Sequence, residues 1–171
     1  MKRFSAVTMI ALAAATLGVS AAVSQTTTPK PAPTYEQVIV RNWKATHDKI
    51  LIMAKDTVFP DAKLGWKPHP DSRSVLEEFR HVTIGLEMTT AEANGQKFDF
   101  EAREKMDVNK PKTRASVVQE MQAAMTASYK AVEAKQTPLL IGWLEHQGEH
   151  YGKLVTAYRV NGVVPPISRP K

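Results

Sequence analysis

Residues 144–152 have the sequence Leu-Glu-His-Gln-Gly-Glu-His-Tyr-Gly, in which His146 and His150 lie four positions apart in a segment of helical character. An α-helix turns by about 100° per residue, so side chains four apart project from one face, about 6 Å from each other. Two imidazoles placed in this way can bind one metal ion, each through a ring nitrogen at about 2 Å. They supply only two ligands, so another helix must supply at least one more.

Apolar residues with helical spacing recur in four segments and predict an all-α fold. The segments span residues 35–55, 74–94, 114–135 and 138–160. Ser74 and Glu77 form a predicted capping box at the start of the second segment, and Thr137-Pro138 is a typical helix start. Asn161-Gly162 is a typical helix stop. Helices of about twenty residues, about 30 Å long, are expected to pack as a four-helix bundle.

A polar stretch, residues 96–112, joins the second and third predicted helices. It is long enough to span the length of a bundle, whereas the other predicted connections are shorter. The second and third helices can therefore run parallel.

The N-terminus has the layout of a secretory signal peptide over residues 1–24. Met1-Lys2-Arg3 is basic, residues 4–19 are mainly apolar, and residues 20–24 are small enough for cleavage after Ala22 or Ser24. The apolar run is too short for a convincing transmembrane helix, so we expect an exported, periplasmic or secreted protein with no stable membrane anchor after cleavage. Residues 25–34 are rich in Thr and Pro and are expected to be a flexible segment before one domain, residues 35–171.

Charge and cysteine content exclude several functions. The chain has a formal net charge of +6, and loss of Lys2 and Arg3 with the signal peptide removes two positive charges. No basic run is interleaved with aromatic residues, so no nucleic-acid partner is expected. The chain contains no cysteine, which excludes disulfides, a cysteine nucleophile, a lipidated cysteine and covalently attached haem. A small-molecule substrate and a homodimer are both compatible with the sequence.

Three further histidines are candidates for the missing ligand. His81 lies in the second predicted helix beside the stripe of Ile84 and Gly85, so we expect it to point inward. His47 is expected at the margin of the core, and His69 lies in a Pro-bounded loop and is expected to be exposed. A single histidine on a helix is more often a hydrogen-bonded core residue than a ligand, so this spacing alone leaves the choice open.

Several motifs together resemble the DinB/YfiT-like family of metalloenzymes. The resemblance extends over nearly the whole mature chain, from Trp43 to Pro166. It includes Lys67-Pro68, His81 with the preceding Arg-Ser-Val, the His146-x-x-x-His150-x-Gly152 motif, and the tail Tyr158-Arg159-x-x-Gly162-x-x-Pro165-Pro166. Where members commonly have Gln after the glycine, this chain has Lys153.

The resemblance implies a four-helix bundle with up-down-down-up order and a divalent metal held by three histidines. Residue by residue, these are His81, His146 and His150. Zinc is the default ion, and nickel, iron and copper also suit imidazole ligands. Glu77, Glu149 and Gln147 are candidate hydrogen-bond acceptors for the remaining ring nitrogens. The implied function is a metal-dependent hydrolase or transferase of unknown substrate and unknown catalytic residues. Some relatives use low-molecular-weight thiols, which are cytoplasmic, so the predicted export argues against the same reaction.

Three other interpretations are less favoured. Residues 146–150 fit the H-x-x-E-H signature of inverted zinc proteases, but no Asp or Glu follows His150 to provide the acidic ligand. A b-type haem would need a Met opposite His150, and none is evident. The chain could also be a non-catalytic helical bundle that binds a partner.

Overall fold

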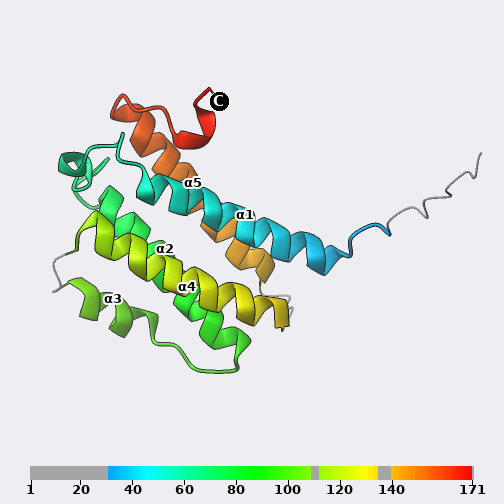
Figure 1. Cartoon of the computed structure of the whole chain (residues 1–171). Coiled ribbons are helices and arrows are strands. Elements are labelled where there is room, and N and C mark those ends of the chain that lie inside the picture. The colour runs from blue at the N-terminus through cyan, green and yellow to red at the C-terminus, as the bar shows by residue number, and fades with distance from the viewer. Residues whose placement is uncertain (1–30, 109–111, 135–139, 171) are drawn as a thin grey trace, which may run out of the picture. The chain divides into compact units, whose positions relative to one another are not determined.

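The computed structural model describes residues 31–108, 112–134 and 140–170, and this part of the chain is all-helical with no strand (Figure 1). The prediction of an all-α fold is therefore confirmed. The chain divides into two units, Met1–Ala32 and Pro33–Lys171, and every described helix belongs to the second. The elements are α1 (Tyr35–Lys55), α2 (Val75–Ala93), α3 (Phe100–Val108), α4 (Arg114–Ala134), α5 (Leu140–Val160) and the 3₁₀ turns Asp61–Lys63 and Pro166–Ser168.

Some predicted features fall outside the described residues. They are the signal peptide over residues 1–24, residues 25–30 of the Thr/Pro-rich segment, and the Thr137-Pro138 helix start. Residues 31–34 belong to no helix and are exposed. Within the described part, no helix combines the length and apolarity needed to cross a bilayer.

Local capping explains where the long helices begin and end. Ser74 and Glu77 form the predicted capping box at the start of α2, where the Glu77 carboxylate accepts a 2.7 Å hydrogen bond from the Ser74 amide. Thr34 and Gln37 form the same motif before α1. Gly95 and Gly162 follow α2 and α5 with φ of 70° and 77°. Glycine adopts this left-handed conformation without the steric cost of a side chain, so both helices stop there.

The connection between α2 and α4 differs from the prediction, because it contains the short helix α3. The sequence there is polar and has almost no apolar stripe, so periodicity gave no helical signal. Tertiary contacts hold α3 in place instead. Asp99 caps it by accepting a 2.9 Å hydrogen bond from the Ala102 amide. The Arg103 guanidinium binds both oxygens of Glu87 on α2, at 2.8 and 3.1 Å.

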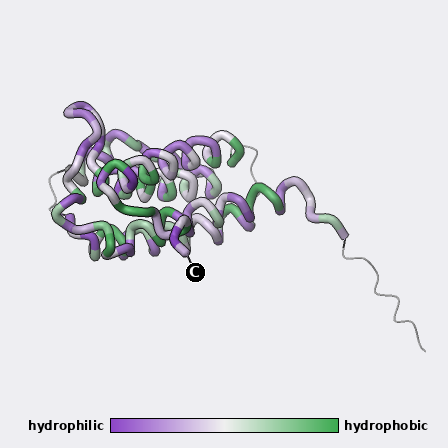
Figure 2. The backbone as a smooth tube through the Cα atoms, turned by 90° about the horizontal axis from the view of Figure 1, so that it is seen from above, coloured by the Kyte–Doolittle hydropathy of each residue, from purple (hydrophilic) through white to green (hydrophobic). Residues whose placement is uncertain are grey.

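The four long helices share one hydrophobic core. α2 packs on α4, α1 packs on α4 and α5, and α2 also contacts α5 (Figure 1). Hydrophobic and hydrophilic residues alternate along the helices, as one-sided burial requires (Figure 2). Two hydrogen bonds satisfy polar groups within this core: Trp43 Nε1 donates to Ser128 Oγ at 3.1 Å, and the Tyr158 hydroxyl donates to the Met53 carbonyl at 2.6 Å.

Candidate metal centre

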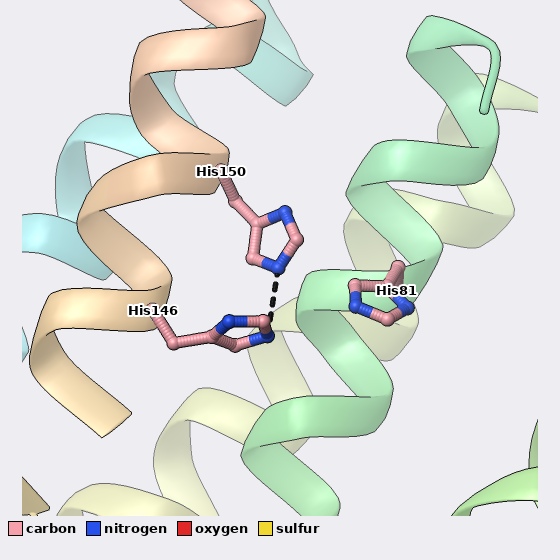
Figure 3. Close-up of side chains that lie close together, drawn as sticks. All are labelled: His81, His146 and His150. Carbon is pink, nitrogen blue, oxygen red and sulfur yellow. Dashed lines mark hydrogen bonds between the residues drawn. The ribbon is translucent and has the colours of Figure 1, made fainter. Parts of the chain in front are cut away.

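The structure brings together the three predicted ligands, His81 from α2 and His146 and His150 from α5 (Figure 3). One ring nitrogen from each lies within 4.8 Å of the others. The ring centroids are 4.4 Å apart for His146 and His150, 4.7 Å for His81 and His150, and 6.0 Å for His81 and His146. In the part of the chain that the structure describes, this is the one group of three such side chains placed to hold a metal ion.

The closest approach is 3.0 Å, between Nε2 of His146 and Nε2 of His150. At this distance one Nε2 donates its proton to the other as a hydrogen bond (Figure 3), and a metal ion that binds both rings takes the place of that proton. Two nitrogens bound to one ion at about 2.0–2.1 Å, with an angle of about 90–110°, would lie about 2.8–3.4 Å apart. The observed separation therefore fits two ligands of a single ion.

The side chains are buried to different degrees. His150 is 1% exposed and His81 is 8% exposed, whereas His146 is partly accessible. Packing of α2 against α5 fixes the first two rings from both sides. The centre is therefore closed toward the core and accessible on the side of His146.

Carboxylates hold the far ring nitrogens of two of the histidines. Glu78 lies 2.5 Å from Nδ1 of His150, and Glu104 lies 3.1 Å from Nδ1 of His81. A carboxylate accepts the Nδ1 proton, which leaves the Nε2 lone pair free and the ring oriented. This carboxylate–histidine arrangement is typical of metal-ligating imidazoles and strengthens them as ligands.

These acceptors correct the sequence-based candidates Glu77, Glu149 and Gln147. Glu77 caps α2 and forms a 3.3 Å ion pair with Lys67. Glu149 is exposed, and Gln147 is 1% exposed with its amide beside Gly85 and near His47. None of the three hydrogen-bonds to a ligand ring.

The two observed acceptors, Glu78 and Glu104, differ in whether the sequence alone could have indicated them. Glu78 lies three residues before His81, one helical turn away on the same side of α2, so its spacing is an available signal. Glu104 belongs to α3, which has no periodic pattern, and no local feature of the sequence brings it to His81.

The electrostatics of the site favour neutral imidazoles beside an ionised acid. Burial lowers the pKa of His81 and prevails over the hydrogen bond to Glu104, which acts in the opposite direction, and the charges of Arg73 and His150 lower it further. Burial and the charge of His150 likewise lower the pKa of His146. Burial opposes ionisation of Glu78, but the hydrogen bond and charge of His150 prevail and lower the pKa of that carboxyl. Metal ligation requires neutral imidazole, so these shifts favour it.

The remaining histidines are separate from the centre. His69 is exposed in its loop, as predicted, with 66% of its side chain accessible. His47 is 1% exposed, deeper than the predicted core margin, and its Nδ1 lies 2.8 Å from the Trp43 carbonyl. The Gln147 amide lies nearby, yet His47 Nε2 and Gln147 Oε1 have no well-formed hydrogen bond among the described residues.

A cavity of about 740 Å³ opens at the three histidines. All three rings line it, together with the apolar side chains of Phe100 and Trp143. The His81 and Phe100 rings meet edge to face at 5.2 Å, and the His146 and Trp143 rings do so at 5.8 Å. The centre can therefore be reached by a small molecule.

Comparison with known proteins adds no further assignment, since no family model, curated protein or solved structure matches this chain.

Proposed function

We propose that His81, His146 and His150 bind one divalent metal ion through their Nε2 atoms, and that this centre is the functional site of the protein. The observation that carries the proposal is the combination of convergent rings with carboxylates on the opposite nitrogens of two of them. Histidines buried only for packing have no need of both features. The 3.0 Å approach of His146 and His150 supports a shared ion.

Zinc is the ion that we expect, with nickel or iron as alternatives, because imidazole ligands suit all three. With three neutral ligands, a divalent ion keeps its full charge and an open position at which bound water is acidified to a pKa of about 7. The chain's own residues have supporting roles. Glu78 and Glu104 fix two rings, and Phe100 and Trp143 form an apolar wall beside the open side.

This chemistry favours a metal-dependent hydrolase or transferase that acts on a small molecule. Export through the N-terminal signal peptide, to the periplasm or outside the cell, is part of the same proposal. It keeps the centre away from cytoplasmic thiols and favours substrates that are available outside the cytoplasm.

We also propose the up-down-down-up helix order of a DinB-like bundle for α1, α2, α4 and α5. Contacts between helix pairs support this order. When the residue numbers of successive contacts rise along one helix and fall along the other, the two helices are antiparallel. The antiparallel pair α1 and α4 has the contacts Trp43 with Ser128 and Ala54 with Arg114. The antiparallel pair α2 and α5 has the contacts Glu78 with His150 and Glu92 with Trp143. The parallel pair α1 and α5 has the contacts His47 with Gln147 and Met53 with Tyr158.

Elemental analysis of protein purified without a His tag tests the metal centre. We expect about one equivalent of zinc, nickel or iron per chain, and a small fraction of that in His146→Ala. His69→Ala, which alters an exposed histidine, is the matched control and should keep the full metal content. Metal should raise the melting temperature of the wild type and of the control only, because binding stabilises the native state. Equal metal content in wild type and His146→Ala would contradict the proposal.

A further inference from the structure

Two cationic side chains lie at the mouth of the histidine centre. Arg73 and Lys153 line the 740 Å³ cavity that contains the three rings, and both also line a neighbouring cavity of about 820 Å³. They therefore stand where the two spaces adjoin. A molecule bound in the 740 Å³ cavity would therefore lie near both of them.

The local structure explains how each cation reaches this position. Lys153 follows His150 by three residues on α5, so both project from similar sides of the helix. It is exposed, and no hydrogen bond or ion pair joins it to another described residue. Arg73 lies just before the cap of α2 and approaches Glu104, the carboxylate that holds His81, at 3.3 Å. Its side chain remains 39% exposed, so it can also contact a ligand.

The charge balance of this region favours an anion. Among the charged groups that line the cavity or hydrogen-bond to its histidines, the carboxylates of Glu78 and Glu104 are balanced by Arg73 and Lys153, and the three imidazoles are neutral as ligands. Glu149 also acts on His146, so a divalent ion in the centre would leave an excess of positive charge that is only partly compensated. Such an excess in a partly enclosed site attracts a negatively charged ligand.

The walls of the 740 Å³ cavity indicate what else the ligand carries. Met88, Phe100 and Trp143 line it with apolar surface, in addition to the cationic Arg73 and Lys153. Inorganic phosphate would leave this surface without a partner. An organic acid with an aromatic or branched aliphatic group would bury it.

We propose that this cavity binds a small organic carboxylate whose apolar group packs against Phe100 and Trp143 and whose carboxylate lies between Arg73 and Lys153. The inference rests on the metal centre proposed above and specifies the substrate class for it. Arginine presents a planar fork that matches a carboxylate, and lysine adds a mobile positive charge. A second donor group of the same molecule can then face the three histidines.

A matched pair of probes tests this assignment on the full-length protein loaded with cobalt(II), whose visible spectrum reports ligand binding. The probes are 2-benzyl-3-sulfanylpropanoate and its carboxamide, which share the thiol and the benzyl group and differ in having an anionic carboxylate or a neutral amide. We expect the carboxylate to bind at least about tenfold more tightly to the wild type, as expected for charge-assisted hydrogen bonds. In Lys153→Gln and in Arg73→Gln this preference should fall to about threefold or less.

Lys130→Gln, which removes an exposed lysine on α4, should leave the preference unchanged. Cobalt content is measured in every variant, because Arg73 contacts Glu104, the carboxylate that holds His81. If Arg73→Gln loses metal, the result for Lys153→Gln decides the outcome. If the two probes bind with equal affinity to a protein that has a normal cobalt spectrum, the carboxylate site is overturned and the metal centre is not. Absence of cobalt binding in the wild type would overturn the metal centre as well.

Discussion

His150 and His47 are both 1% exposed, and each lies on a long helix of the same bundle, yet their surroundings are opposite. His150 meets a carboxylate at 2.5 Å on one nitrogen and another imidazole at 3.0 Å on the other. His47 meets a backbone carbonyl at 2.8 Å on one nitrogen, and its other nitrogen has no well-formed partner among the described residues.

Burial alone therefore does not distinguish a ligand histidine from a core histidine. The distinguishing feature is which groups surround the ring. His150 converges with two other imidazoles, and a carboxylate orients its far nitrogen, whereas the rings beside His47 belong to Trp43 and Tyr129, which offer no ligand for a metal ion.

The largest expected effect comes from removing the carboxylate behind His150. Glu78→Gln keeps the size of the side chain but removes its charge, so metal affinity should fall by about 10–100-fold. Competition with a chromophoric chelator measures this affinity. Glu77→Gln is the matched control, because the adjacent residue caps α2 without touching a ligand ring, and it should retain wild-type affinity. Equal losses in both variants would mean that general charge near the site, rather than the contact to His150, sets the affinity.

The next effect concerns His47 and acid. Burial lowers the pKa of His47 to about 4, against about 6.5 in the unfolded chain. The unfolded state therefore binds a proton first as the pH falls, and this residue's contribution to stability is complete above about pH 6.5 and is lost toward pH 4. Between pH 7 and pH 5 the loss should be about 2 kcal/mol.

Denaturant unfolding with a metal chelator present measures this contribution, because the chelator removes metal binding from the comparison. His47→Asn should lose about 2 kcal/mol less than the wild type over that pH interval. Tyr129 of α4 and Gln147 of α5 flank the His47 ring. Neither becomes charged in this pH range, because burial raises the pKa of the Tyr129 hydroxyl and the Gln147 amide does not titrate. His69→Gln should follow the wild type, and an identical pH dependence in His47→Asn would show that the buried ring is not the source.

The smallest effect is expected where α2 meets α5 between these two histidines. A Cβ on Gly85 would lie 2.7 Å from Nε2 of Gln147, closer than real contacts allow. Gly85→Ala gains about 1 kcal/mol of helix propensity but forces the buried amide to move, so the two effects should nearly cancel. In a Gln147→Ala background, where that contact is absent, the same substitution should stabilise the fold by about 1 kcal/mol. If the changes in unfolding free energy of the two single variants simply add in the double variant, the alanine at position 85 does not act through its contact with Gln147.

The sequence predicted the helices well where they have a buried face and capping residues. The bounds of α1 and α4 lie within one residue of the prediction, and the cap at Ser74 is as expected. The helix α3 was not predicted, because contacts with α2 rather than an apolar stripe hold it.

The candidate site was predicted in its ligands but not in its surroundings. Spacing placed His146 and His150 together, and the resemblance to a family added His81. The carboxylates are a matter of rotation about the helix: Glu77 and Glu78 are neighbours in sequence, but only Glu78 points toward α5. Glu104 depends on how α3 docks, and the depth of His47 depends on packing from three helices. Neither follows from local periodicity.

X-ray absorption at the metal edge of the zinc-loaded protein tests the central claim most directly. Three imidazole nitrogens at about 2.0–2.1 Å and one further light atom are predicted for the wild type, and one imidazole fewer for the zinc that His146→Ala binds when zinc is supplied in excess. A shell made only of oxygen atoms, or the same number of imidazoles in both proteins, would contradict a metal centre built from His81, His146 and His150.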